Sequence, residues 1–145
     1  MATSGSILGQ GTQLKMGDGQ SPENFTTIAE VTNLDPPSLN RDDLDVTNHD
    51  STLGYREFKP GLRNPGEVGF SINWMPKNST HDQTSGLLRE FELDTIRNWK
   101  IVFPPAANAT LNLKGYVREF TPHAPTDNVL TADVVIKVTE RPVLS

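Results

Sequence analysis

The sequence contains no cysteine among its 145 residues. Neither a disulfide framework nor a thiolate metal site is therefore possible. Long apolar runs are also absent, and the first residues, MATSGSILGQG, lack the basic and apolar regions of a signal peptide. We expect a soluble protein that is made in a cytoplasm and does not enter a membrane.

Basic residues are scarce. Thirteen Lys and Arg stand against 18 Asp and Glu, which gives a formal net charge of −5, and no basic run occurs. Proteins that bind nucleic acid tightly gain affinity from Lys and Arg contacts to phosphates. The composition therefore argues against tight DNA binding, but it leaves open a role in which DNA passes close by without binding.

Residues that often bind metals are scattered along the chain. His49, His81 and His123 have no companions at ligand spacing, and we interpret them as solvated loop or cap residues. The acidic segment RDDLD, residues 41–45, lacks the glycine turn and the terminal glutamate of a calcium loop. We therefore expect no metal site and no cofactor.

The case for an enzyme is equally weak. Glu90, Glu92 and Asp94 are close enough in sequence to suggest a glycosidase pair, but they stand at the end of an amphipathic helix, where surface charge is ordinary. The sequence has no GxSxG elbow, no HExxH motif, no phosphate loop and no dinucleotide fingerprint. We expect a protein without catalytic residues.

The chain divides into a flexible N-terminal arm, residues 1–24, and a single domain, residues 25–145. The arm is rich in Gly, Ser, Thr and Gln and holds at most one weak strand around Leu14. Alternating apolar residues predict strands along the rest of the chain. They fall at Phe25–Leu34, Ser38–Asn48 (weaker), Gly66–Pro76, Asn98–Pro104, Ala109–Pro122 with a bulge near Gly115, and Asn128–Pro142.

One segment, NSTHDQTSGLLREFELD, changes to helical spacing. Thr80 and Gln83 have the spacing of a capping box, and Leu87, Leu88 and Phe91 fall on one face. Gly86 inside this helix costs about 1 kcal/mol relative to alanine, which indicates close packing there. We expect a mainly β protein, a sandwich or barrel with one flanking α-helix.

The strand at Gly66–Pro76 has two unlike sides, because side chains alternate between the faces of a strand. One side is apolar and belongs in the core, whereas the other carries only Gly69, Ser71 and Asn73 after Glu67. The other expected core residues occupy equivalent apolar positions elsewhere. The full set is Val68, Phe70, Ile72, Trp74, Leu87, Leu88, Phe91, Trp99, Ile101, Phe103, Val134, Ile136 and Val138.

A long loop is expected at about residues 48–66. Loops of this length inside compact domains are usually functional or disordered. This one contains several large apolar residues, which disordered segments tend to lack. We therefore favour a loop that becomes ordered against a partner, with a mobile surface loop as the alternative.

Several phrases, taken together and in order, resemble the major tail tube protein family of long-tailed bacteriophages, of the lambda type. They are FSINWMP (70–76), LLREF (87–91), WKIVFP (99–104), LKGYV (113–117) and VVIKVTERP (134–142). The resemblance covers roughly residues 25–142. It implies a β-sandwich with a flanking helix, whose copies form hexameric rings that stack into a hollow tube for genome ejection.

The resemblance also implies partners and a location. Copies of the chain would contact one another and other tail proteins (tape measure, distal tail and terminator proteins), in the virion tail and away from membranes. It implies no cofactor and no catalytic residue. DNA would pass through the lumen without specific binding, so we expect a lining that is small, polar and free of cations.

Combined with the strand pattern, the resemblance assigns two sets of site residues. If the sheets of neighbouring copies join edge to edge into a continuous barrel, the residues expected to face the lumen are Glu67, Gly69, Ser71, Asn73, Glu119 and Asp133. The long loop would contact the next ring, through Leu53, Tyr55, Arg56, Glu57, Phe58, Lys59, Leu62 and Arg63.

Other functions stay open at this point. A terminator, a distal tail protein or the tube of a contractile system would share the same fold. A carbohydrate- or receptor-binding sandwich is a different class, and it would need an exposed aromatic platform, whereas Trp74 and Trp99 alternate in phase with core residues. An acid–base hydrolase is a distant third.

Overall fold

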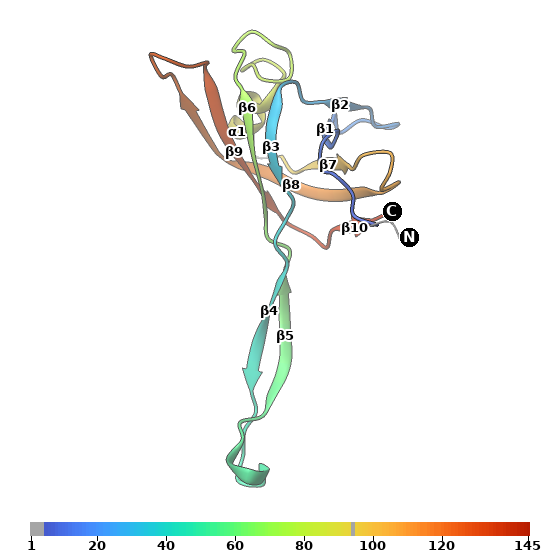
Figure 1. Ribbon diagram of the computed structural model, residues 1–145, viewed down its shortest axis with the longest axis vertical. Coiled ribbons are helices and arrows are strands. Elements are labelled where there is room, and N and C mark those ends of the chain that lie inside the picture. The colour runs from blue at the N-terminus through green and yellow to red at the C-terminus, as the bar shows by residue number, and fades with distance from the viewer. Residues whose placement is uncertain (1–4, 94) are drawn as a thin grey trace.

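The computed structural model describes residues 5–93 and 95–145 (Figure 1). Met1–Ser4, part of the expected arm, and Asp94, one of the carboxylates considered above, lie outside the described residues. The strands are β1 Gln13–Gly17, β2 Phe25–Thr27, β3 Val31–Asp35, β4 Asn40–Asp45, β5 Phe58–Asn64, β6 Glu67–Asn73, β7 Arg97–Val102, β8 Thr110–His123, β9 Thr131–Val138 and β10 Val143–Leu144. The helices are a 3₁₀ turn, η1 Thr52–Gly54, and α1 Leu87–Glu92.

Eight strands form one antiparallel sheet, and two form a separate hairpin. The order in the sheet is β2-β1-β7-β8-β9-β6-β3, with β10 paired to β8, and the hairpin consists of β4 and β5. Strands β1 and β3, from opposite parts of this order, come into contact, so the sheet folds over on itself around the core. The helix α1 packs against β8. The prediction of a mainly β fold with one flanking helix is confirmed.

The core lies between the folded halves of the sheet and follows the alternation of the sequence. In the register of β6 and β9, Val68 lies opposite Ile136 and Phe70 opposite Val134. Full burial of each such side chain contributes about 1.5–3 kcal/mol. Of the expected core residues, the buried ones are Val68, Phe70, Ile72, Leu87, Trp99, Ile101, Val134, Ile136 and Val138, while Trp74 and Phe103 are partly buried against them.

The weak strand expected around Leu14 in the N-terminal arm is present, and it belongs to the core of the sheet. Residues 13–17 form β1, which lies between β2 and β7 rather than at an edge. Leu14 pairs with Ile101 and is fully buried, and Met16 pairs with Trp99. The two apolar side chains bury themselves because strands from much later in the chain cover them. The composition of the flanking residues gives no indication of this.

The single strand expected at Phe25–Leu34 is two strands. Glu30 has a left-handed backbone conformation, with φ of 58°, and L-residues in that conformation do not continue a strand. The chain turns there, so that β2 pairs with β1 while β3 pairs with β6. The strand β3 ends at Asp35, directly before two prolines, as the sequence predicts.

The helix is shorter than expected and presents a different face. It begins after Gly86, and Thr80 does not cap it but accepts a hydrogen bond from the Ala29 amide at 3.1 Å. Phe91, expected in the core, is 46 % exposed, and Leu88 is only half-buried. In place of Phe91 the helix buries Glu90, whose carboxylate pairs with the guanidinium of Arg97 at 3.2 Å.

His81 is fully buried, which corrects its interpretation as a solvated residue. Its Nδ1 accepts a hydrogen bond from the Met75 amide at 3.1 Å, and its Nε2 lies 2.7 Å from the Ala29 carbonyl oxygen. This arrangement fits a neutral imidazole that donates through Nε2. The histidine thereby ties the segment before α1 to the turn between β2 and β3.

The long loop expected at about residues 48–66 contains the turn and the second strand, β5, of a β-hairpin. The first strand of the hairpin, β4, confirms the weaker strand expected at Ser38–Asn48. The hairpin projects away from the body of the molecule along its longest axis (Figure 1). Neither strand pairs with the eight-stranded sheet.

Candidate assembly surfaces

The strand β8 changes partner along its length and so creates a free edge. Its pairing with β7 ends at Gly115, and its pairing with β9 begins at the same residue. Beyond Gly115, no described strand pairs with the edge of β8 that faces away from β9. The four strands β8, β9, β6 and β3 therefore form a section of sheet with two open edges, one on β8 and one on β3. Open edges can pair with further strands.

One face of this four-stranded section packs on the core, and the other is mainly polar, with Val135 of β9 and Tyr116 of β8 as apolar exceptions. Cross-strand register places Ser71 opposite both Asp133 of β9 and Asn33 of β3, and it places Gly69 opposite Asp35. The residues that the sequence assigned to a lumen all lie on this polar face; they are Glu67, Gly69, Ser71 and Asn73 from β6, Asp133 from β9 and Glu119 from β8. Asn33 and Asp35 also lie on this face, and the sequence gives no sign of it because the pairing of β3 with β6 cannot be inferred from either strand alone.

Asp133 is the centre of a small polar network on this face. The Ser71 hydroxyl donates to its Oδ1 at 2.7 Å, and Nε2 of His123 lies 3.0 Å from its Oδ2. The Ser71 hydrogen bond, followed by the His123 contact, lowers the pKa of Asp133 below its ordinary value. The carboxylate therefore stays ionised at neutral pH.

The polar face is not free of cations, contrary to the expectation for a lining. Lys137 lies opposite Glu67, and Arg118 forms an ion pair with Glu67 at 3.0 Å. A bulge between Val117 and Glu119, and not near Gly115 as expected, lets Arg118 reach this face. A fifth carboxylate, Glu30, accepts a hydrogen bond from the Asn73 side chain at 3.3 Å. With five carboxylates (Glu30, Asp35, Glu67, Glu119 and Asp133) against two cations, the formal charge of the face is −3.

The packing of the subunit does not require the side chains at the centre of the polar face to be small. A Cβ at Gly69 would meet only Oδ2 of Asp35, at 4.0 Å. By contrast, a Cβ at Gly115 would lie 2.2 Å from the Lys137 carbonyl oxygen. Gly115 is therefore fixed by close backbone approach, whereas the space above Gly69 is open and would accept a larger side chain.

The hairpin is the second candidate surface. All residues of β4 are exposed, and every residue of β5 except Gly61 is exposed. The residues assigned to an inter-ring contact lie on it, from Leu53 and Tyr55 at the tip, through Arg56 and Glu57, to Phe58, Lys59, Leu62 and Arg63 on β5. Arg63 stands directly opposite Arg41, an unfavourable like-charge pair that the sequence could not reveal without the register.

The described residues give no sign of metal or membrane chemistry. No group of three or more His, Asp or Glu among them is placed to hold a metal ion. No helix in the described ranges is long and apolar enough to cross a membrane. The three histidines stand apart in the structure as well: His49 is exposed near the hairpin tip, His81 is buried, and His123 contacts Asp133.

Comparisons with known proteins give consistent results. Residues 8–145 match the family model described as lambda phage tail tube protein. Among solved structures, the chain is similar to one from the tail of an empty gene transfer agent particle refined with C6 symmetry (TM-score 0.76, 15 % identity, 97 % of this chain and 99 % of that one). It is also similar to a chain from the sheath/tube terminator structure of an extracellular contractile injection system, PVC (TM-score 0.73, 11 % identity, 99 % of both chains).

A third similar structure is the tube-terminating cap of the anti-feeding prophage (TM-score 0.71, 13 % identity, 100 % of this chain and 94 % of that one). No curated protein sequence matches this chain. At these identities the solved structures establish the shared fold, and the family model establishes the relationship. The chain belongs to the lambda phage tail tube protein family.

Proposed function

We propose that this chain forms hexameric rings that stack into the tube of a phage tail, the conduit through which the genome leaves the particle. The symmetry is taken from the gene transfer agent tail, which was refined with C6 symmetry. The role is structural and needs no catalytic residue and no cofactor. Its partners are further copies of the chain and, at the ends and inside the tube, terminator, distal tail and tape measure proteins.

The observation that carries this proposal is the four-stranded section with two open edges. If β3 of one copy pairs with β8 of the next, both edges are satisfied and the sections join into one closed barrel. The apolar face of that barrel is already covered by the core of each subunit. Only the polar face is left to line the bore.

The polar face suits the passage of DNA. Its formal charge of −3 per subunit repels phosphates, which stand at about one charge per 1.7 Å of the duplex axis. The ion pair between Arg118 and Glu67 neutralises one of the two cations. Gly69 and Ser71 have little or no side chain to project from the centre of the face, so the bore stays wide and hydrated.

The hairpin connects one ring to the next in this proposal. The chain from Asn40 to Leu53 spans at most about 45 Å when extended. The hairpin shares no strand pairing with the main sheet, so it can reach another ring without disturbing the barrel. The hairpin carries both signs of charge, in Arg56, Glu57, Lys59 and Arg63, and these residues would set the register between rings by charge complementarity.

Electron microscopy of the purified protein tests the proposal. We expect hollow filaments whose reconstruction shows the Ser71 face toward the bore. Single rings that never stack would indicate a terminator instead, and dispersed monomers at every concentration would contradict assembly altogether. Filaments in which the Ser71 face packs against protein would refute the assignment of the lining while leaving the tube intact.

A further inference from the structure

The two open edges of the four-stranded section differ in the charges that they carry. Strand β3 has one charged residue, Asp35, at its end. The free part of β8, which we define as residues 116–123, contains Arg118, Glu119 and His123. Arg118 and Glu119 are consecutive, and the bulge lets both reach the polar face. The β8 edge therefore offers a cation and an anion in adjacent positions, whereas the β3 edge offers a single anion.

Asp35 has no partner within its own subunit, whereas Arg118 has unused donors. The Asp35 carboxylate is exposed and makes no hydrogen bond or ion pair with any described residue. Arg118 contacts Glu67 through Nη2 at 3.0 Å, and its side chain is 49 % exposed. Because a guanidinium has five N–H donors, Arg118 can bind a second carboxylate without releasing the first.

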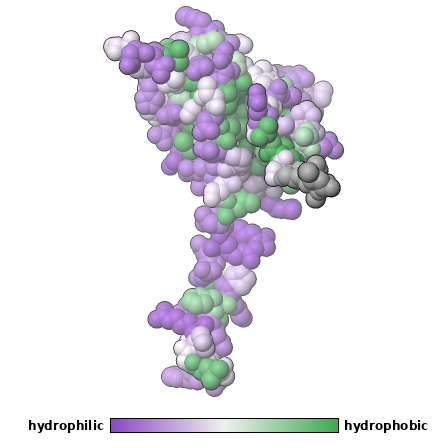
Figure 2. Space-filling view, in the orientation of Figure 1, coloured by the Kyte–Doolittle hydropathy of each residue, from purple (hydrophilic) through white to green (hydrophobic). Residues whose placement is uncertain are grey.

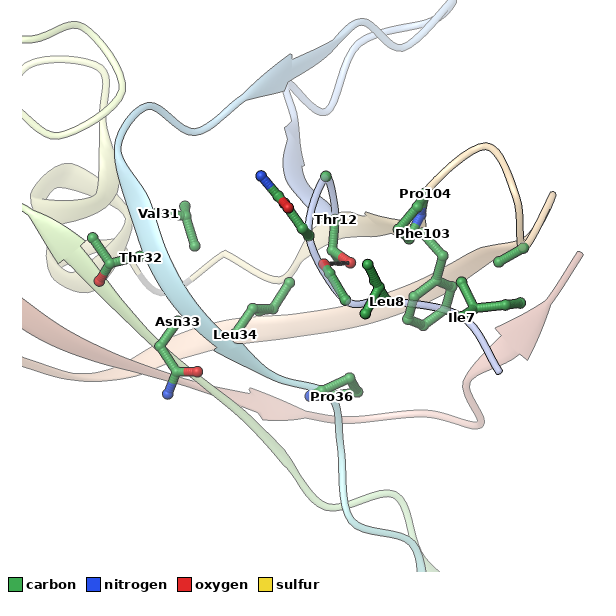
Figure 3. A pocket seen from close by; sticks show the side chains of 14 residues that line it. Ile7, Leu8, Thr12, Val31, Thr32, Asn33, Leu34, Pro36, Phe103 and Pro104 are labelled. Atoms are coloured by element: carbon green, nitrogen blue, oxygen red, sulfur yellow. Dashed lines mark hydrogen bonds between the residues drawn. The ribbon is translucent and has the colours of Figure 1, made fainter. Parts of the chain in front are cut away.

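The alternation of side chains limits how the two edges can pair. Copies in one ring share one orientation, so β3 of one copy runs antiparallel to β8 of the next. Figure 3 shows Leu34 pointing into the cleft beside β3 and Asn33 pointing away from it. A shift by one residue would exchange these two faces, because neighbouring side chains lie on opposite sides of a strand. The allowed registers therefore differ by steps of two residues.

Apolar contacts do not choose among these registers. On the core side, Val31 and Leu34 of β3 would meet Val117 and Phe120 of β8, so a shift by two residues again brings apolar against apolar. In the view of Figure 2, hydrophobic patches on the body are interrupted by hydrophilic residues, so apolar contact does not dominate this side of the molecule. The choice is left to the charged residues of the polar face.

Three registers bring β3 alongside the free part of β8, and they differ in what Asp35 meets. Without a shift, Asp35 and Glu119 belong to the same row across the sheet, so two carboxylates would face each other, which is unfavourable. Shifted toward the end of β8, Asp35 would lie opposite Thr121 and meet no cation. Shifted toward the beginning of β8, it would lie opposite Tyr116 and diagonal to Arg118, within reach of a long side chain.

The chain beyond Asp35 favours this last register. Two prolines follow, Pro36 and Pro37, which cannot donate to a neighbouring strand; Figure 3 shows the first of them at the end of β3. The edge of β8 is free only from Tyr116 onward, because β7 pairs with Gly115. With Asp35 opposite Tyr116, pairing stops at the same level on both edges.

We propose that Asp35 of one copy forms an ion pair with Arg118 of the next copy in the ring, with Asp35 opposite Tyr116 in the joined sheet. The inference rests on the proposed function and names the register of its ring joint. In this register the side-chain amide of Asn33 lies opposite Glu119 and donates a hydrogen bond to it. Each carboxylate at the joint thereby has a donor from the other copy.

Disulfide formation reads the register directly, because the native chain has no cysteine. Residues directly opposite in an antiparallel pair have Cα atoms about 4.5–5.5 Å apart, within the range of about 4.4–6.8 Å that a disulfide spans. The test variant combines Asn33→Cys with Glu119→Cys, which leaves Asp35 and Arg118 in place. Its filaments are oxidised mildly and dissolved without a reducing agent.

Two comparison variants report the competing registers. Asn33→Cys is combined with Thr121→Cys for the register without a shift, and with His123→Cys for the shift toward the end of β8. We expect a denaturing gel to show linked multimers up to the hexamer for the test variant and only single chains for the other two.

The outcomes separate the inference from the proposed function. Links in either comparison variant, or filaments of the test variant without links, would overturn the inference and leave the proposed function standing. If wild-type protein forms no filaments at all, the proposed function fails and the inference fails with it.

The substitution Asp35→Arg gives an independent measurement, because the competing registers predict opposite signs. Next to Arg118 the new guanidinium is repelled, and we expect the protein concentration needed for filaments to rise at least about tenfold. Opposite Glu119 the same substitution would lower that concentration. The control is Asp127→Arg in the exposed turn between β8 and β9, which makes the same charge change away from the joint. A concentration for Asp35→Arg equal to or below that of the control would contradict the ion pair.

Discussion

Replacing Gly86, the N-cap residue of α1, with alanine should destabilise the subunit strongly. A Cβ at this position would lie 2.5 Å from backbone atoms of Thr80, His81 and Asp82. Backbone atoms cannot rotate away as the end of a flexible side chain can. Either the segment before α1 or the helix itself must therefore shift.

The size of the effect follows from what that shift disturbs. Gly86 has extended backbone angles at the N-cap of α1, a position where glycine is favoured over alanine. Overpacking a tight site costs about 1–3 kcal/mol. Movement of His81 also weakens its hydrogen bonds to Met75 and Ala29, each worth about 0.5–1.5 kcal/mol. We expect a net loss of roughly 2–4 kcal/mol in the free energy of unfolding.

Gly69→Ala is the matched control, since the same methyl group meets only Asp35 Oδ2, at 4.0 Å. Glycine inside a strand costs about 0.5–1 kcal/mol relative to alanine, so this variant should be unchanged or slightly more stable. Urea unfolding of dispersed subunits, followed by tryptophan fluorescence, measures both. If Gly86→Ala proves as stable as wild type at the same m-value, the argument from close packing is wrong.

Five further substitutions test the core and the polar face. Glu90→Ala should lower the free energy of unfolding by about 3 kcal/mol, because it leaves the largely buried guanidinium of Arg97 without its carboxylate partner. Phe91→Ala, at an exposed position, should lower it by less than about 1 kcal/mol in the same unfolding assay. The lowered pKa of Asp133 contributes stability that is present above the ordinary value of 3.8 and is lost as the pH falls through the lowered pKa. An acid titration of Asp133→Asn, or of Ser71→Ala, should therefore show a weaker loss of stability than that of wild type. Gly69→Arg should fold normally but give filaments that retain duplex DNA. The logarithm of the DNA-binding constant should fall with the logarithm of the salt concentration, with a slope of about −0.9 for each phosphate contacted. Retention that does not depend on salt, or no retention at all, would contradict the assignment of Gly69 to the lining of the bore.

The sequence predicts those parts of the fold in which nearby residues alternate between apolar and polar. Strand β6 alternates Val68, Phe70 and Ile72 with small polar residues, so its buried and open faces can be assigned without knowing which strands pair with it. The same holds for β9. Because the polar side of β6 is also the open side of the sheet, the candidate lining could be identified from a single strand.

Long-range pairing determines the parts that could not be predicted. Leu14 and Met16 are buried only because β7, more than eighty residues later, supplies Ile101 and Trp99 opposite them. Likewise, the sequence gives Glu90 no apolar character, and its burial depends on Arg97 from another element. Local periodicity contains no information on either partner.

The bulge in β8 explains why Arg118 was not expected on the polar face, whereas Lys137 alternates in phase with Asp133 along β9 and could have been placed there from the sequence. In a regular strand, Arg118 and Glu119 would point to opposite faces. The extra residue between Val117 and Glu119 lets both reach the same face, where Arg118 finds Glu67. A one-residue irregularity therefore changes the charge of the surface, and no pattern in the sequence fixes where it occurs.

The two candidate assembly surfaces are mechanically separate, and this separation matters for a polymer. In the proposed assembly, copies within a ring join through the backbone edges of β3 and β8, which would pair antiparallel. Rings would join through the hairpin of β4 and β5, which has no strand pairing with the main sheet. A substitution on the hairpin should therefore weaken stacking without opening the wall of a ring, because different strands carry the two kinds of contact.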